Sequence, residues 1–172
     1  MNKTEFEQSE FESYYGRYID KLPESRSLRE GFVLGKKETI AFFQSVPEDK
    51  LNYRYEEGKW SVKEVFQHLI DTERIFVYRA FRIARRDQTS LAGFDQDVYV
   101  APSNANKKSL SDLVNEFEAT RNYSISLINS LSDEDLKTVG VSSNKPMSAR
   151  ASLFTIIGHY IWHTEVIKER YL

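Results

Sequence analysis

The most informative stretch of the sequence is residues 58–73, which read GKWSVKEVFQHLIDTE. Ser61 followed three residues later by Glu64 is a capping box, in which each side chain accepts a hydrogen bond from the other residue's backbone N–H. Apolar residues then recur at helical spacing as far as about Arg86, and they are Val62, Val65, Phe66, Leu69, Ile70, Phe76 and Val77. The stretch therefore predicts a long amphipathic helix over residues 61–86.

Three further segments carry the same helical period. Apolar residues recur every three to four positions in residues 26–46, 109–131 and 148–171, and strand-like alternation is scarce throughout the chain. The last of these segments is apolar nearly all round, which indicates burial on several sides. A shorter helix with an aromatic face is expected over residues 4–20, before Pro23.

Two connections between the helices are expected to be loops. Residues 87–108 are rich in Gly, Asp, Asn and Ser and contain Pro102, and a connection of this length inside a compact domain is often functional. Residues 140–147 form the second expected loop, and a short helix is expected to start at Ser132.

Four long helices with one long crossover between the second and the third predict an all-α four-helix bundle with a short N-terminal helical extension. The length of 172 residues favours a single domain over residues 1–172, with the core of the bundle over about residues 26–172. An α-solenoid is the weaker alternative, because the spacing has no fixed period.

The overall charge argues against nucleic acid and anionic membranes as partners. The formal net charge is only −2, so no global field would recruit a polyanion. A local basic cluster, Arg79, Arg82, Arg85 and Arg86, is interpreted as a solvated helix end that complements the helix dipole.

The sequence favours a soluble protein of the cytoplasm. Cysteine is absent, so disulfides and thiol nucleophiles are excluded. The first residues, MNKTEFE, are acidic and amphipathic and do not resemble a signal peptide. No run approaches the roughly 18 consecutive apolar residues of a membrane-spanning helix. We therefore expect cytoplasmic localisation and no membrane partner.

The chain has only three histidines, and all three can reach one ion. His159 and His163 stand at i and i+4 in the last helix, where Cβ atoms are about 5–6 Å apart. His68 lies beside the apolar stripe of its own helix, so the three rings can face one cleft between the two helices. Three imidazoles with an open position are typical of catalytic sites, whereas structural zinc sites usually have four protein ligands. Such pairs also arise without metal, as surface or hydrogen-bonded core residues.

The motifs of several enzyme classes are missing. The chain has no His-Glu-x-x-His of a metalloprotease, no P-loop, no Gly-rich dinucleotide turn and no Gly-x-Ser-x-Gly elbow. No catalytic general base is identifiable from the sequence.

Residues 58–73 resemble the signature of the DinB-like (YfiT-like) metal-binding four-helix-bundle superfamily. In that signature an aromatic residue and a Ser or Thr precede a helix with a His-Leu…Asp…Glu run. Residues 159–163, HYIWH, are similar to its His-x-x-x-His in the last helix, and residues 93–100, GFDQDVYV, resemble the crossover of one branch. The resemblance extends over roughly residues 28–172.

This resemblance implies a divalent metal (Zn, Ni, Mn or Fe) on His68, His159 and His163, and a homodimer. Some relatives use the metal to activate a low-molecular-weight thiol, such as bacillithiol or mycothiol, for S-transfer or isomerisation. The leading hypothesis is therefore a metal-dependent thiol S-transferase or hydrolase-like enzyme acting on a small-molecule thiol or another small substrate. The alternative is a non-catalytic stress-response bundle in which the metal is structural.

Four residues are further candidates around the site. Glu73 lies near the centre of an apolar stripe, where an unpaired charge costs several kcal/mol, and we favour an internal ion pair with Arg121 over a carboxylate that orients a ligating imidazole. Trp60 is interpreted as core or pocket wall. Asp95 and Tyr99 lie on the crossover and could face the open coordination position, although loop solubility explains them equally well.

Overall fold

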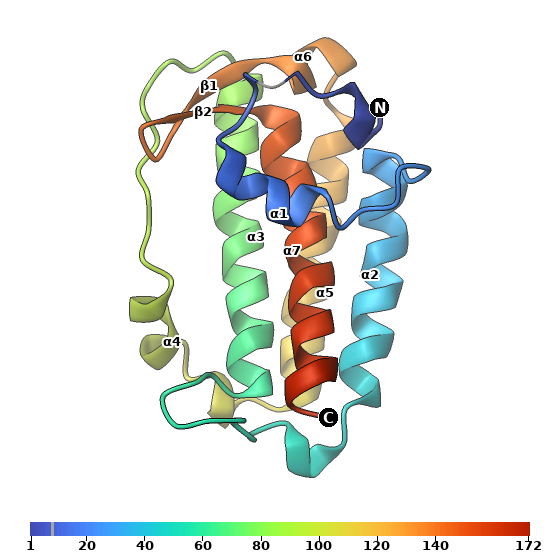
Figure 1. Cartoon of the computed structure of the whole chain (residues 1–172), viewed down its shortest axis with the longest axis vertical. Helices are drawn as coiled ribbons and strands as arrows, with labels where there is room; N and C mark the ends of the chain where they lie inside the picture. Colours follow the sequence, from blue (N-terminus) through green and yellow to red (C-terminus); the bar gives the residue numbers. More distant parts are fainter. Residues whose placement is uncertain (8) are drawn as a thin grey trace.

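Four long helices form the body of the molecule in the computed structural model, which describes residues 1–7 and 9–172 (Figure 1). They are α2 (Leu28–Ser45), α3 (Val62–Ala84), α5 (Leu110–Asn129) and α7 (Ala149–Arg170). α2 and α7 run in one direction, and α3 and α5 run in the other (Figure 1). α3 packs against both α7 and α5, and α2 packs against the same two helices from the opposite side. The predicted four-helix bundle is confirmed.

A serine cap starts each long helix. At the start of α3, Ser61 N donates to Glu64 Oε2 at 2.7 Å and Glu64 N donates to Ser61 Oγ at 3.2 Å, so the predicted capping box is present. The starts of the other three helices have equivalent serine caps, at Ser27, Ser109 and Ser148. Each such cap stabilises a helix by about 1 kcal/mol.

The core of the bundle is filled by large aromatic side chains. Phe43 of α2 and Phe66 of α3 stack with ring centroids 3.8 Å apart and an interplanar angle of 5°. Every long helix contributes a phenylalanine that is at most 1% exposed, and these are Phe32, Phe43, Phe66, Phe117 and Phe154. Burying each such side chain contributes roughly 1.5–3 kcal/mol.

A buried ion pair crosses this core. Arg121 of α5 donates from Nε to Glu73 Oε1 at 2.8 Å and from Nη2 to Glu73 Oε2 at 2.9 Å. Ser124 Oγ donates to the same carboxylate at 2.6 Å, and both charged side chains are at most 1% exposed. The ion pair favoured from the sequence is confirmed, and the bidentate geometry accounts for a charge in the apolar stripe.

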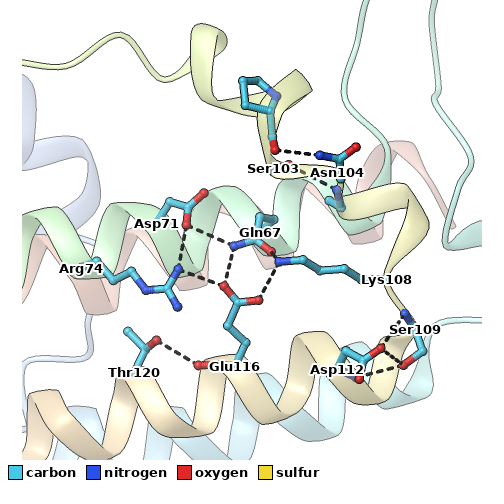
Figure 2. A network of polar contacts seen from close by, with 12 residues as sticks. Gln67, Asp71, Arg74, Ser103, Asn104, Lys108, Ser109, Asp112, Glu116 and Thr120 are labelled. Atoms are coloured by element: carbon cyan, nitrogen blue, oxygen red, sulfur yellow. Dashed lines mark hydrogen bonds and ion pairs between the residues drawn. The ribbon is translucent and has the colours of Figure 1, made fainter.

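A second polar network joins α3 to α5 at the end of the crossover (Figure 2). Gln67 Nε2 donates to Asp71 Oδ1 at 3.1 Å and to Glu116 Oε1 at 2.9 Å. Lys108 Nζ donates to Gln67 Oε1 at 2.6 Å and to Glu116 Oε2 at 2.7 Å, and Arg74 contacts both carboxylates. The network fixes the residue next to His68 and the end of the crossover to the bundle.

The crossover between α3 and α5 runs back along the length of the bundle (Figure 1). The prediction of a structureless loop over residues 87–108 is wrong in part, because α4 (Asp97–Ser103) and the 3-10 turn η4 (Ala105–Lys107) lie within it. The side chain of Asp95 accepts a hydrogen bond from Asp97 N at 3.0 Å at the start of α4. A helix this short has too few apolar positions to reveal its period in the sequence.

The second expected loop is also wrong, because it forms a hairpin. β1 (Val139–Ser142) pairs antiparallel with β2 (Lys145–Ser148). Ser143 and Asn144 make the turn with φ of 53° and 62°, the left-handed conformation that two-residue hairpin turns require. The expected short helix after Ser132 is present as α6 (Asp133–Lys137), and a further 3-10 turn, η3 (Glu48–Lys50), follows α2.

The N-terminal extension is less helical than the sequence predicts. Among its described residues, only η1 (Lys3–Glu5), η2 (Ser13–Tyr15) and α1 (Gly16–Ile19) are helical. Phe11 instead forms a β-bridge with Met147, and Phe6 packs edge-on against Phe154 with ring centroids 5.3 Å apart. The aromatic side chains of this segment thus reflect packing against the bundle rather than a helical face.

Gly158 allows the extension to lie directly on α7. A Cβ atom at this position would stand 1.9 Å from the backbone oxygen of Tyr18, so any side chain would displace α1. The glycine thereby determines how closely α1 approaches α7. Within the described ranges, no helix is both long and apolar enough to span a membrane.

The buried ion pair leads to a prediction about stability. Arg121→Met leaves Glu73 as an uncompensated charge in the core, and we expect the free energy of unfolding to fall by about 3–5 kcal/mol. The double variant Glu73→Leu/Arg121→Met removes both charges and should recover most of this loss. Urea denaturation followed by circular dichroism measures both values.

The matched control for this prediction is Arg29→Met, which removes an arginine at the surface that pairs with Asp133 and donates to the Leu131 carbonyl. An exposed pair contributes about 0–1 kcal/mol, so this variant should unfold nearly as the unmodified protein does. Equal losses in Arg121→Met and Arg29→Met would contradict the role assigned to the buried pair.

Candidate metal centre

The three histidines come from two neighbouring antiparallel helices. His68 lies two turns into α3, while His159 and His163 lie one turn apart in α7. All three side chains are buried, with 5–8% of their surface exposed. Ring centroids are 4.5–5.1 Å apart for the three pairs. The structure therefore brings together the three residues that the sequence singled out.

Two of the three pairs of ring nitrogens have the spacing of ligands on one tetrahedral ion. His159 Nε2 lies 3.2 Å from His68 Nε2 and 3.0 Å from His163 Nε2. Two nitrogens each about 2.0–2.1 Å from a tetrahedral metal are about 3.3 Å apart. Ligand atoms of the three residues all lie within 4.8 Å of one another. The donor set and its spacing therefore suit a divalent cation such as zinc.

The same contacts are poorly satisfied as ordinary hydrogen bonds. A neutral imidazole nitrogen either donates one hydrogen or offers one lone pair. His159 Nε2 faces two nitrogens of the same kind, so no single tautomer gives both contacts good hydrogen-bond geometry. A cation at the meeting point of the three lone pairs would remove this conflict.

Burial keeps all three rings neutral, which is the form that binds metal. Burial lowers the pKa of His68 to about 4. Burial also lowers the pKa of His159 well below its usual value, and the charged forms of the other two histidines lower it further. The pKa of His163 falls well below its usual value through burial and through His68. The cluster is thus free of competing protons near pH 7.

Surrounding side chains hold the rings in place. Thr72 Oγ1 lies 3.4 Å from His68 Nδ1, where a proton on Nδ1 leaves Nε2 free as a ligand. Trp60 packs on the His68 ring at 4.7 Å, and Tyr171 Oη donates to the Trp60 carbonyl at 2.8 Å. Trp60 is therefore a wall of the site, as the sequence suggested.

Tyr18 and Trp162 complete the aromatic enclosure. Tyr18 packs edge-on against His159 with centroids 5.0 Å apart, and Trp162 packs edge-on against His163 at 4.7 Å. No feature of the sequence indicated that Tyr18 would reach the site, because its position depends on how the extension crosses α7.

A cavity of about 540 Å³ adjoins the cluster on the His159 side. Its walls come from α3, α7, the N-terminal extension and the crossover, and the lining residues are Tyr14, Tyr15, Tyr18, Thr72, Phe76, Arg79, Gly93, Phe94, Asp95, Gln96, Asp97, Ser143, Thr155 and His159. This volume suits a small organic molecule. The three-histidine cluster therefore has access to a ligand-sized space.

Of the other three candidate residues, only Asp95 lines this cavity. Asp95 lines the cavity from the exposed part of the crossover. Tyr99 does not line it, and contributes to a much smaller crevice beside His68. Glu73 lies in the ion pair with Arg121 and has no hydrogen bond to a histidine, so the interpretation of Glu73 as a carboxylate that orients an imidazole is wrong.

The interpretation of the basic cluster as a solvated helix end is wrong for Arg79. This side chain is only 2% exposed and lines the cavity. Its place could have been found from the sequence, because Thr72, Phe76 and Arg79 follow His68 at intervals of four, four and three on one face of the helix. Arg85 and Arg86 are exposed, as expected.

Comparison with known proteins identifies a family and solved structures with a similar fold. The model of the DinB superfamily matches residues 32–167. No curated protein sequence matches the chain. The solved structure of YfiT from Bacillus subtilis, described as a probable metal-dependent hydrolase with an unusual four-helix bundle topology, is similar with a TM-score of 0.70 and 17% identity. That similarity covers 87% of this chain and 90% of YfiT.

The chain is also similar to the mycothiol-dependent maleylpyruvate isomerase, with a TM-score of 0.65 and 13% identity. This second similarity covers 86% of the chain but only 61% of the isomerase. At these identities both likenesses concern the fold alone.

The geometry predicts which substitutions abolish metal binding. His68→Ala, His159→Ala and His163→Ala each remove one of three ligands, and each should weaken zinc binding by more than about a hundredfold. Thr72→Val removes only the group that orients His68, and we expect a loss of about tenfold. Competition with a chromophoric chelator measures the affinities, and circular dichroism checks folding. A His68→Ala variant that binds zinc as tightly as the unmodified protein would contradict the ligand set.

The buried histidines also predict how the metal-free protein responds to acid. In the unfolded chain the His68 ring takes up a proton below pH 6.5, whereas in the folded chain it does so only below about pH 4. Stability should therefore be complete above pH 6.5 and fall as the pH drops towards 4, by about 3 kcal/mol for this ring. Urea denaturation of chelator-treated protein from pH 7.5 to 4 measures the loss, and His68→Gln should lose correspondingly less. Parallel curves for the two proteins would show that the ring is not buried as described.

Proposed function

The chain belongs to the DinB superfamily, and from the site that it carries we propose that it is a divalent-metal enzyme that uses a low-molecular-weight thiol, a thiol S-transferase. The observation that carries this proposal is that the three-histidine cluster adjoins, through His159, a cavity of about 540 Å³. Three protein ligands beside a ligand-sized space are the pattern of a catalytic metal site.

His68, His159 and His163 would hold the ion, which can be Zn, Ni, Mn or Fe. When bound, such an ion acts as a Lewis acid that lowers the pKa of a coordinated thiol or water. The chain contributes neutral rings, because burial keeps their pKa values low. Trp60, Tyr18 and Trp162 pack against the three rings and limit their movement.

The charges around the cavity support a thiol rather than water as the activated group. Among the residues that the structure describes, the metal-ligand cluster includes no carboxylate. Asp95 and Asp97, the acidic residues that line the cavity, are exposed on the crossover. A free thiol has a pKa near 8.5 and free water one near 15.7, so a coordinated thiol needs a much smaller fall in pKa than coordinated water to ionise at neutral pH.

A hydrolase is the second candidate. The fold similarity to YfiT, described as a probable metal-dependent hydrolase, favours it. In that case Asp95 and Asp97, which line the cavity, are the carboxylates that can accept the proton of the attacking water, so a hydrolase that uses them should lose activity when both are replaced by Asn. A thiol transferase should keep most of its activity in the same variant.

A purely structural metal is the rival to both enzymes. The packing of the core argues against a structural metal, because five phenylalanines that are at most 1% exposed stabilise the bundle without the ion. An ion present at a thousandfold its dissociation constant adds only about 4 kcal/mol to the native state. The bundle should therefore survive removal of the metal.

This difference gives a test of the two classes. Chelation of the unmodified protein, and the substitution His163→Ala, should both lower the melting temperature while leaving the helical circular dichroism signal at room temperature unchanged. Loss of the helical signal on chelation would show a structural metal and would falsify the catalytic proposal.

Activity is tested on the same samples. The protein loaded in turn with Zn, Ni, Mn or Fe is incubated with bacillithiol or mycothiol and monochlorobimane, where thiol transfer displaces chloride and produces fluorescence. We expect turnover with at least one metal and thiol, and none after chelation or in His163→Ala. Hydrolysis of p-nitrophenyl esters without thiol transfer would favour the second candidate.

A further inference from the structure

Arg79 is a buried cation without a carboxylate partner. Its side chain is 2% exposed. Arg74, Arg82 and Arg121 each pair with a carboxylate, whereas Arg79 pairs with none in residues 1–7 and 9–172. Buried charges in proteins are normally paired, because an isolated charge in the interior is destabilising. The missing negative charge therefore requires an explanation.

The protein holds the Arg79 guanidinium in place but leaves part of it free. Nη2 donates to the Ala92 carbonyl at 2.9 Å and to Ser143 Oγ at 3.3 Å. The guanidinium carbon lies 4.8 Å from the ring centroid of Phe76 and 5.7 Å from that of Phe94. The neutral hydroxyl of Tyr15 is the other polar partner of the guanidinium. Neither Nε nor Nη1 donates to a carboxylate of a described residue, so an arginine with five donors retains unused ones beside the cavity.

Aromatic side chains form the part of the cavity wall that surrounds Arg79. Phe76 and Phe94 flank the guanidinium, and Tyr14, Tyr15 and Tyr18 line the same space. Burial raises the pKa of the Tyr15 hydroxyl and lowers the pKa of Arg79, and neither group gains a full charge partner from the other at neutral pH. These walls suit an apolar or aromatic molecular body rather than a highly polar one.

Of the residues that the structure describes, one positive side chain and two acidic side chains line this cavity. Asp95 and Asp97 lie on the exposed crossover wall, opposite in sign to Arg79. A phosphate or other multiply charged anion would face repulsion from the two carboxylates, and a single arginine would not neutralise it. One carboxylate matches one guanidinium in charge and in the planar arrangement of its acceptors.

The cavity reaches from Arg79 to the histidine cluster. Eleven residues separate His68 from Arg79, which is about 16 Å along the axis of α3. His159 lines the same cavity. A molecule that occupies both ends must be elongated, on the order of 10 Å, because the long Arg79 side chain leans towards the start of α3 and shortens the span to His159.

We propose that this cavity binds an elongated organic monocarboxylate, with its carboxylate on Arg79, its aromatic or apolar body between Phe76, Phe94 and the tyrosines, and its far end beside His159. The inference rests on the proposed function in one respect, namely that the bound carboxylate is also the substrate of the metal site. Binding to Arg79 itself requires no metal.

The test compares three probes of similar shape, biphenyl-4-carboxylate, biphenyl-4-carboxamide and biphenyl-4-yl phosphate, by titration calorimetry on the full chain with and without zinc. We expect the carboxylate to bind at least about tenfold more tightly than the carboxamide and than the phosphate, in both metal states. Equal affinities for the carboxylate and the carboxamide, or no binding of any probe, would overturn the proposal. A preference for the phosphate would overturn the assignment of a monocarboxylate.

Substitutions at Arg79 locate the interaction. Arg79→Gln should abolish the preference for carboxylate over carboxamide, and Arg79→Lys, which keeps the charge but not the planar fork, should retain part of it. Arg85→Gln removes one exposed charge from the same helix outside the cavity and should leave all affinities unchanged. A preference that persists in Arg79→Gln but disappears on chelation would show that the metal, not Arg79, holds the carboxylate.

The outcome is separable from that of the proposed function. If the protein binds no metal or transfers no thiol, the carboxylate preference of the metal-free chain still decides this inference. If the preference is absent, metal content and thiol transfer to the uncharged monochlorobimane remain unaffected. If the melting temperature of Arg79→Gln is far below that of the unmodified protein, the affinities of Arg79→Lys and Arg85→Gln for the carboxylate and the carboxamide are compared instead. A reduced carboxylate preference in Arg79→Lys alone supports the proposal, and equal preferences in the two variants overturn it.

Discussion

Ser152 Oγ donates a hydrogen bond of 2.8 Å to the backbone carbonyl of Phe76, and this contact fixes α7 against α3. The two helices are antiparallel, so equal distances from this point lead to facing residues (Figure 1). His68 lies eight residues before Phe76 and His159 lies seven after Ser152, which is about 12 Å and about 10 Å of helix respectively. The near equality brings the imidazoles to one point, and a shift of one turn in either helix would separate them.

The sequence predicted the parts of the protein that depend on helical periodicity and caps. Ser61 and Glu64 located the start of α3, and the three histidines could be placed on facing flanks by counting residues. The hairpin was missed because Ser143 and Asn144 adopt left-handed conformations without the glycine that usually reveals such a turn. The packing of the N-terminal extension on α7 could not be predicted, because it depends on a contact between segments far apart in the chain.

Two buried arginines show how the same residue type serves stability in one place and remains open in another. Arg121 forms an ion pair with Glu73. This pair could be predicted from the sequence, because a carboxylate in an apolar stripe needs a positively charged partner. Arg79 was interpreted from its neighbours Arg82 and Arg85 as part of a solvated helix end, although its position on the His68 face pointed inward. The two arginines differ in whether a carboxylate lies beside them. A sequence shows which residues are charged, but it does not show which of these charges the fold leaves unpaired.

The site divides into a rigid part and a peripheral part. The three histidines and Arg79 lie on α3 and α7, whose positions are set by the buried core. Much of the cavity wall comes instead from Tyr14, Tyr15 and Tyr18 and from residues 93–97, which lie outside the four long helices. Loops and extensions tolerate change more readily than packed helices. Changes in these wall segments can therefore alter which molecule fits the cavity, while the ligand geometry on the helices stays fixed.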